Sequence, residues 1–121
     1  MRSQPEELQE LSLDSGVVEC DASGYLTDPL NWSREFAEHV AREQDITLTD
    51  EHYAVIEFMR DFNEEHGVMA DARFVLKFLA ERHQTNKKGA LKLMFDLFPY
   101  GYVSQACKIA GMKQPRAWST G

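Results

Sequence analysis

Residues able to carry covalent chemistry are scarce in this chain of 121 residues, which contains two cysteines and four histidines. Cys107 stands near the C-terminus in the stretch QACKIAG, and Lys108 and Lys113 follow it. Positive charge favours the thiolate, the reactive form of cysteine, so Cys107 is a candidate nucleophile. The other interpretation is a small buried hydrophobe, because Cys107 shares a helical stripe with Val103 and Ala110. The residues alone favour this second interpretation.

The remaining candidate ligands form no recognisable site. Cys20 is interpreted as a packing residue, and the two cysteines do not form a CxxC pair. The histidines do not show the HExxH spacing of a zinc site, so we expect no metal and no cofactor. Two cysteines are also too few for a disulfide-stapled scaffold.

Composition indicates a single globular domain, since 43% of the residues are apolar and 27% are charged. No apolar run approaches the roughly 20 residues that span a bilayer. The N-terminal stretch MRSQPEELQELSL lacks the apolar core of a secretory signal. We therefore expect a cytoplasmic protein that makes no membrane contact.

Charge is divided unevenly along the chain. Residues 1–72 hold 4 Lys/Arg against 18 Asp/Glu, whereas residues 73–121 hold 9 Lys/Arg against two acids. The simpler interpretation is a basic surface that pairs with acids of the same domain. The alternative is a cationic face for an acidic protein or a nucleic acid. In that case residues 73–92 form a helix-turn-helix-like pair whose cations contact phosphates.

Hydrophobic periodicity predicts a mainly α-helical domain with a small N-terminal β-hairpin that turns at residues 14–16. Ser33 or Asn31 is expected to cap the first helix, and Thr49 and Gly67 to bound the second. A short helix beginning at Gly89 is expected to bury a set of apolar side chains, Leu91, Met94 and Phe95. Helices are predicted over residues 31–44, 48–67, 71–83, 89–98 and 102–111, with a turn at 85–88.

Several short motifs together resemble the DsrC/TusE family of sulfur-relay proteins, over roughly residues 11–116. The motifs LFPYG and QACKIAG, at this spacing, are the most specific. The resemblance rests on Gly24-Tyr25-Leu26, Trp32, Leu48-Thr49-Asp50-Glu51-His52, Arg60, Arg73, Lys88-Gly89, Leu97-Phe98-Pro99-Tyr100-Gly101 and Gln105-Ala106-Cys107-Lys108-Ile109-Ala110-Gly111.

The resemblance implies an orthogonal helical bundle with an N-terminal hairpin, a helix-turn-helix-like pair and a flexible C-terminal arm. We expect a flexible leader over residues 1–10, the family domain over 11–111 and the arm over 112–121. The implied function is sulfur relay, as in tRNA thiolation, sulfur oxidation or sulfite reduction. Implied partners are sulfur-transfer complexes of the TusBCD or DsrEFH type, sulfite reductase and heterodisulfide-reductase-like proteins. Family members are often labelled sulfurtransferases, but no independent enzyme is expected here.

The chain departs from the family at one decisive position. The resemblance implies that the family carries persulfide on a penultimate cysteine of the arm, with ten residues between it and the cysteine that matches Cys107. That position is Trp118 here, and an indole does not hold sulfane sulfur. Cys107 is then the persulfide candidate, and the alternative is a non-catalytic regulatory relative that docks on partners. Trp118 either inserts into a partner or folds back on its own domain.

The resemblance also supplies candidate binding residues. Arg73, Lys88 and Tyr100 match family positions that line the region where the arm packs. Lys108 is the charge nearest to Cys107 in sequence, and Trp118 is the aromatic candidate on the arm.

Overall fold

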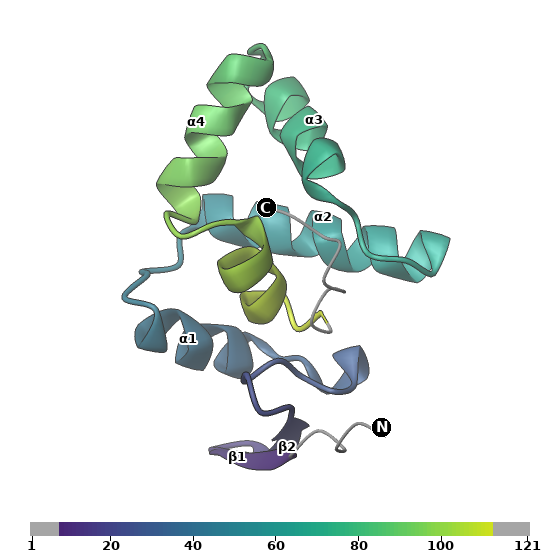
Figure 1. The fold of residues 1–121 in the computed structure, drawn as a ribbon, viewed down its shortest axis with the longest axis vertical. Coiled ribbons are helices and arrows are strands. Elements are labelled where there is room, and N and C mark those ends of the chain that lie inside the picture. The colour runs from purple at the N-terminus through teal and green to yellow at the C-terminus, as the bar shows by residue number, and fades with distance from the viewer. Residues whose placement is uncertain (1–7, 113–121) are drawn as a thin grey trace, which may run out of the picture.

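The structure, a computed structural model, describes residues 8–112 (Figure 1). A two-stranded antiparallel hairpin comes first and four α-helices follow it, so the predicted mainly α fold is confirmed. A short 3-10 turn precedes the first helix, and a π-helix closes the described chain. The elements are β1 (Gln9–Leu13), β2 (Gly16–Cys20), η1 (Pro29–Asn31), α1 (Arg34–Glu43), α2 (Asp50–His66), α3 (Ala72–Arg82), α4 (Lys87–Leu97) and η2 (Tyr102–Cys107).

The hairpin forms where the sequence predicts it, around residues 14 and 15. Leu13 pairs with Gly16 in register, and β1 begins at Gln9, within the stretch expected to be a leader. The carboxylate of Glu35 on α1 accepts hydrogen bonds from the backbone N–H groups of Asp14 and Ser15. These contacts attach the hairpin turn to the start of the helical part.

The predicted helix boundaries are confirmed where capping residues set them. Ser33 begins α1, because its hydroxyl accepts a hydrogen bond from the N–H of Phe36 at 3.1 Å. Thr49 begins α2 in a reciprocal capping pair with His52. Gly67 ends α2 in the left-handed region with φ of 72°.

The start of α4 differs from the prediction. Asn86 caps this helix by accepting a hydrogen bond from the N–H of Gly89 at 2.8 Å. Lys87 and Lys88 therefore lie in the first helical turn and not in the preceding loop. Asn86 lies in the polar stretch TNKK, whose residue types are equally typical of a turn, so the sequence alone did not identify it as the cap.

The buried face of α4 was also predicted wrongly. Leu91 and Phe95 are 40% and 53% exposed, whereas Met94 is buried. The stripe that packs against the core is Ala90, Met94 and Leu97, at i, i+4 and i+7. Ala90 is fully buried in this stripe, whereas Leu91 and Phe95 are turned outward.

The last helix lies at the centre of the molecule. In Figure 1, η2 is enclosed by α1 on one side and by α2 with the α3–α4 pair on the other. Ala106 and Cys107 of η2 are fully buried, and so are Ile109 and Ala110, which follow it. The core closes around them with large side chains from α1, α2, α3 and the C-cap of α4, namely Phe36, Ile56, Leu79 and Phe98.

Candidate functional site

The thiol of Cys107 is sealed inside the domain. Its side chain is 0% exposed, and Sγ lies 3.5 Å from Sδ of Met69, to which it donates. Met69 belongs to the loop that joins α2 to α3. The same loop accepts a hydrogen bond from the hydroxyl of Tyr102, through the carbonyl of Ala70. Residues 67–71 therefore lie over η2 and separate Cys107 from solvent.

Burial controls the reactivity of this thiol. It raises the pKa of Cys107 to about 12, although a hydrogen bond with Tyr102 acts in the opposite direction. The thiol form is therefore strongly favoured over the thiolate at neutral pH. Lys108 lies elsewhere, because its ammonium packs over the ring of Tyr25 at 5.2 Å from the centroid. The proximity of Lys108 in sequence thus brings no thiolate-stabilising charge to Cys107.

Two side chains clamp the end of the last helix. The indole N–H of Trp32 donates to the carbonyl of Ile109 at 2.9 Å. Arg60 donates through Nη1 to the carbonyl of Ala110 at 2.8 Å and through Nη2 to the carbonyl of Pro29 at 2.9 Å. Its guanidinium lies 4.6 Å from the centre of the Trp32 ring. The carbonyls that a helix leaves unpaired at its end are thereby satisfied.

Gly111 completes this clamp. Its φ is 75°, and a Cβ atom at this position would lie 2.5 Å from Cδ1 of Trp32. The following residue, Met112, is also buried. The clamp, formed by Trp32, Arg60 and Gly111, therefore fixes the backbone of residues 109–111.

The binding candidates taken from the sequence do not form one cluster. Arg73 is paired with Asp71 at 2.8 Å, and Lys88 is exposed in the first turn of α4. The ring of Tyr100 is 79% exposed, while its backbone N–H donates to the side chain of Gln105. No hydrogen bond or ring contact within residues 8–112 joins these three candidates to one another. Trp118 lies outside the described residues.

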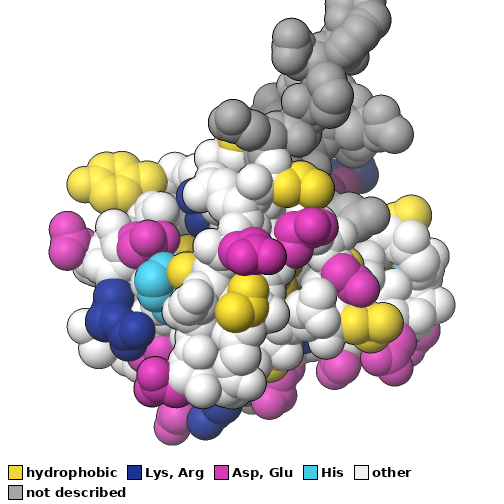
Figure 2. Space-filling view, turned by 90° about the horizontal axis from the view of Figure 1, so that it is seen from below, with side chains coloured by type: hydrophobic (Ala, Val, Ile, Leu, Met, Phe, Trp, Pro, Cys, Tyr) yellow, Lys and Arg dark blue, Asp and Glu magenta, His cyan; other side chains and the backbone are white. Residues whose placement is uncertain are grey.

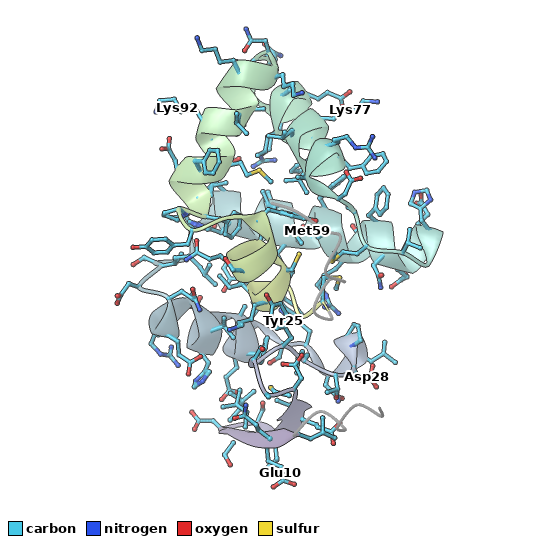
Figure 3. All side chains as sticks on the ribbon, viewed as in Figure 1. Glu10, Tyr25, Asp28, Met59, Lys77 and Lys92 are labelled. Atoms are coloured by element: carbon cyan, nitrogen blue, oxygen red, sulfur yellow. The ribbon has the colours of Figure 1, made fainter. Side chains whose placement is uncertain are left out.

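Three basic side chains of the C-terminal half pair with acids, and Lys77, Lys87 and Lys88 form no salt bridge within residues 8–112. Arg82 contacts Glu51 at 3.0 Å, and Lys92 contacts Asp96 at 3.3 Å. Lys77 and Lys92 lie on opposite outer sides of the α3–α4 pair (Figure 3). The opposite end of the molecule, seen in Figure 2, displays many more acidic than basic side chains. Pairing within residues 8–112 thus accounts for part of the charge asymmetry, and an excess of acids remains at this end.

The described part of the chain, residues 8–112, contains no group of three His, Cys, Asp or Glu side chains that could hold a metal ion. No helix in the same range is long and apolar enough to cross a membrane. The features that can be built into a site are thus the sealed thiol, the clamp and the exposed surfaces.

Comparison with known proteins connects these features. The model of the family described as "DsrC like protein" matches residues 12–117, which includes both the clamp and Cys107. The chain belongs to the DsrC-like family. Its relatives include proteins named sulfurtransferase TusE from Yersinia pestis, 34% identical, and from Photorhabdus laumondii, 37% identical. Each alignment covers 87% of this chain, and 95% and 94% of the relative, respectively.

Solved structures of DsrC proteins share the fold. The oxidised γ-subunit of the dissimilatory sulfite reductase from Archaeoglobus fulgidus superposes with a TM-score of 0.77 at 31% identity. DsrC of Allochromatium vinosum superposes with a TM-score of 0.79 at 30% identity. They cover 90% and 92% of this chain, and 98% of each solved chain is matched. The DsrC-like chain is thus a member of a sulfur-relay family over residues 12–117.

The sequence alone did not identify the residues that surround the thiol of Cys107, or those that hold residues 109–111. Met69 reaches Cys107 through the tertiary fold, whereas Tyr102 lies five residues before it in the same helix, η2. Trp32 and Arg60 belong to the motifs of the family resemblance, yet only the structure shows that both bind the end of η2. Their sequence separation from Ala110, 50 residues or more, hides the contact.

Proposed function

We propose that this DsrC-like chain docks on cytoplasmic sulfur-transfer complexes and does not itself carry sulfur while folded. The observation that carries the proposal is the complete burial of Cys107, the only cysteine in the C-terminal half of the chain. A persulfide forms when a thiolate attacks a sulfane sulfur in line, so the thiol must be both ionised and accessible. Cys107 is neither in this structure.

The arm supports docking as the retained function. The clamp holds the carbonyls of Ile109 and Ala110, shortly before the arm begins in sequence. The family resemblance assigns its cargo cysteine to the position of Trp118, and Trp is a residue type that frequently dominates binding energy at interfaces. We therefore assign Trp118 the role of an anchor that enters a partner in place of a sulfur-loaded cysteine.

The partners proposed are sulfur-transfer complexes of the TusBCD or DsrEFH type, with sulfite reductase and heterodisulfide-reductase-like proteins as further candidates. The names of the relatives support a partner in sulfur metabolism, because they are called sulfurtransferases or a sulfite reductase subunit. By occupying the docking surface without cargo, the chain regulates the access of loaded carriers to the same partner.

Calorimetric titration of the full chain into a purified TusBCD- or DsrEFH-type complex tests this function. We expect binding, and we expect Trp118→Ala to weaken it at least about tenfold, in the range of an interface hot spot. Phe95→Ala is the matched control, since it removes an exposed aromatic ring from α4 and should leave the affinity unchanged. Absence of binding, or equal affinity of Trp118→Ala and the unmodified chain, would refute the proposal.

A further inference from the structure

A shallow cavity of about 460 Å³ opens between α2 and α3. Neither Cys107 nor the residues of the clamp line it. Its apolar floor is formed by Phe58, Phe62 and Phe78. The rings of Phe58 and Phe78 are stacked with centroids 4.6 Å apart. The ring of Phe62 lies 4.9 Å from that of Phe74, which is 43% exposed. The aromatic cluster therefore continues from the core to the surface, where apolar area remains uncovered.

One edge of this groove is acidic. Glu57, Asp61 and Glu65 follow one another on α2 at intervals of four residues, which is about 6 Å along a helix. Within residues 8–112, neither Glu57 nor Asp61 forms a salt bridge with a lysine or arginine. Arg82, at the other edge, is already bonded to Glu51. The groove consequently presents unneutralised negative charge beside an aromatic floor.

We propose that this groove binds a basic amphipathic helix of a partner protein. Apolar side chains on one face of such a helix pack on the aromatic floor, as in other complexes where a helix lies in a groove. Lysine or arginine at every fourth position of the bound helix has the same 6 Å spacing, approximately, as the carboxylates. Charge complementarity thus selects the class of partner. This inference does not depend on sulfur carriage or on the arm.

A second copy of this chain is a less suitable occupant. Its own basic helix, α4, exposes Leu91 and Phe95 beside Lys88 and Lys92. Lys92, however, is paired with Asp96 on the same helix, which reduces the positive charge available for a groove. The partner helix is therefore the favoured occupant, and self-association is distinguished experimentally.

Fluorescence anisotropy with a labelled probe peptide tests the proposal on the full chain. The probe is a designed helix of about 14 residues, with leucine at i, i+3, i+4 and i+7 and lysine beside this stripe. We expect saturable binding. Asp61→Lys and Phe62→Ala should each weaken it at least about tenfold, and Asp61→Lys keeps the test valid if loss of the Phe62 ring impairs folding.

Matched controls separate the groove from general charge attraction. Glu10→Lys changes the net charge by the same amount as Asp61→Lys, but lies on the hairpin at the other end of the molecule (Figure 3). It should leave the affinity within about twofold of the original, as should Phe95→Ala, because neither residue lines the groove. A peptide with serine at the leucine positions should not bind.

Four results would overturn the proposal. The first is no saturable binding of the probe. The second is equal weakening by Glu10→Lys and Asp61→Lys, and the third is equal binding of the serine peptide. The fourth is evidence of another occupant. Tighter probe binding by the Trp118→Ala variant would show that the chain's own C-terminal segment fills the groove. Concentration-dependent sedimentation that Asp61→Lys abolishes would show that a second copy fills it.

Discussion

Burial favours the protonated form of Cys107, whose thiol donates to Sδ of Met69. A thiol in this environment is unavailable to electrophiles until the loop over η2 opens or the domain unfolds. The reactivity of Cys107 is thus determined by its burial in the fold and not by Lys108, its neighbour in sequence.

The first prediction concerns the rate of thiol modification. In a Cys20→Ala variant, where Cys107 is the remaining thiol, Ellman's reagent should react at least about a thousandfold more slowly with the native protein than with the protein unfolded in urea. Absorbance at neutral pH measures both rates. A native Cys107 that reacts within a factor of ten of the unfolded chain would contradict the buried, protonated state.

The second prediction concerns stability at high pH. Burial raises the pKa of Cys107 from the ordinary value near 8.5 to about 12 in the folded protein. The unfolded chain therefore releases the proton first, and the free energy of unfolding should fall by roughly 1.4 kcal/mol per pH unit within this window.

Urea titrations between pH 9 and 10.5 compare the original chain with Cys107→Ala. Other titrating groups contribute equally to both proteins, so the variant should lose stability less steeply. Parallel pH dependences would show that the pKa of Cys107 is not raised by folding.

At the scale of the elements, local chemistry predicts helix ends better than helix faces. Thr49, Ser33 and Gly67 cap their helices through contacts within three or four residues, so the sequence contains the whole signal. The orientation of α4 depends instead on which stripe meets the other helices. Leu91 and Phe95 offered the larger hydrophobic area, yet tertiary packing selected the stripe that contains Ala90.

The candidate site, too, was predicted from the sequence only in part. The importance of Cys107 and Trp118 follows from residue type and family resemblance. The burial of the thiol and the clamp on the last helix arise from contacts between residues tens of positions apart, such as Trp32 with Ile109. No periodicity within a single helix reports such contacts.

The third prediction compares two glycines that end helical segments with similar positive φ angles. Gly111→Ala should destabilise the domain by about 1–3 kcal/mol more than Gly67→Ala, because overpacking adds to backbone strain only at the clamp. A Cβ on Gly111 meets Trp32, whereas nothing lies within 4 Å of a Cβ on Gly67. Equal losses in chemical denaturation would argue against a tight clamp.

At the scale of the whole molecule, some of the opposite charges form salt bridges within the domain. The net charge is −7, and Arg73, Arg82 and Lys92 are each paired with an acid. The acidic end is left in excess, which disfavours approach of a polyanion and favours approach of a basic partner. The groove between α2 and α3 carries acidic side chains of its own, Glu57, Asp61 and Glu65.

The fourth prediction follows from that distribution. A labelled 20-base-pair DNA duplex should show no saturable binding to the full chain at about 100 mM salt, because too few unpaired cations share one face. Anisotropy titrations at several salt concentrations provide the measurement. Submicromolar affinity that falls steeply with salt, with a log–log slope of about −3 or steeper, would instead establish phosphate contacts.

The fifth and most direct test asks where sulfur can be loaded. The full chain and its Trp118→Cys variant are incubated with a persulfide donor, and intact-mass spectrometry detects each added sulfur as about 32 Da. Cys107→Ala versions of both proteins locate the adduct. We predict no adduct on the original chain and one on Trp118→Cys that persists without Cys107. Rapid loading of Cys107 in the folded original chain, with onward transfer of the sulfur to a partner, would contradict the account.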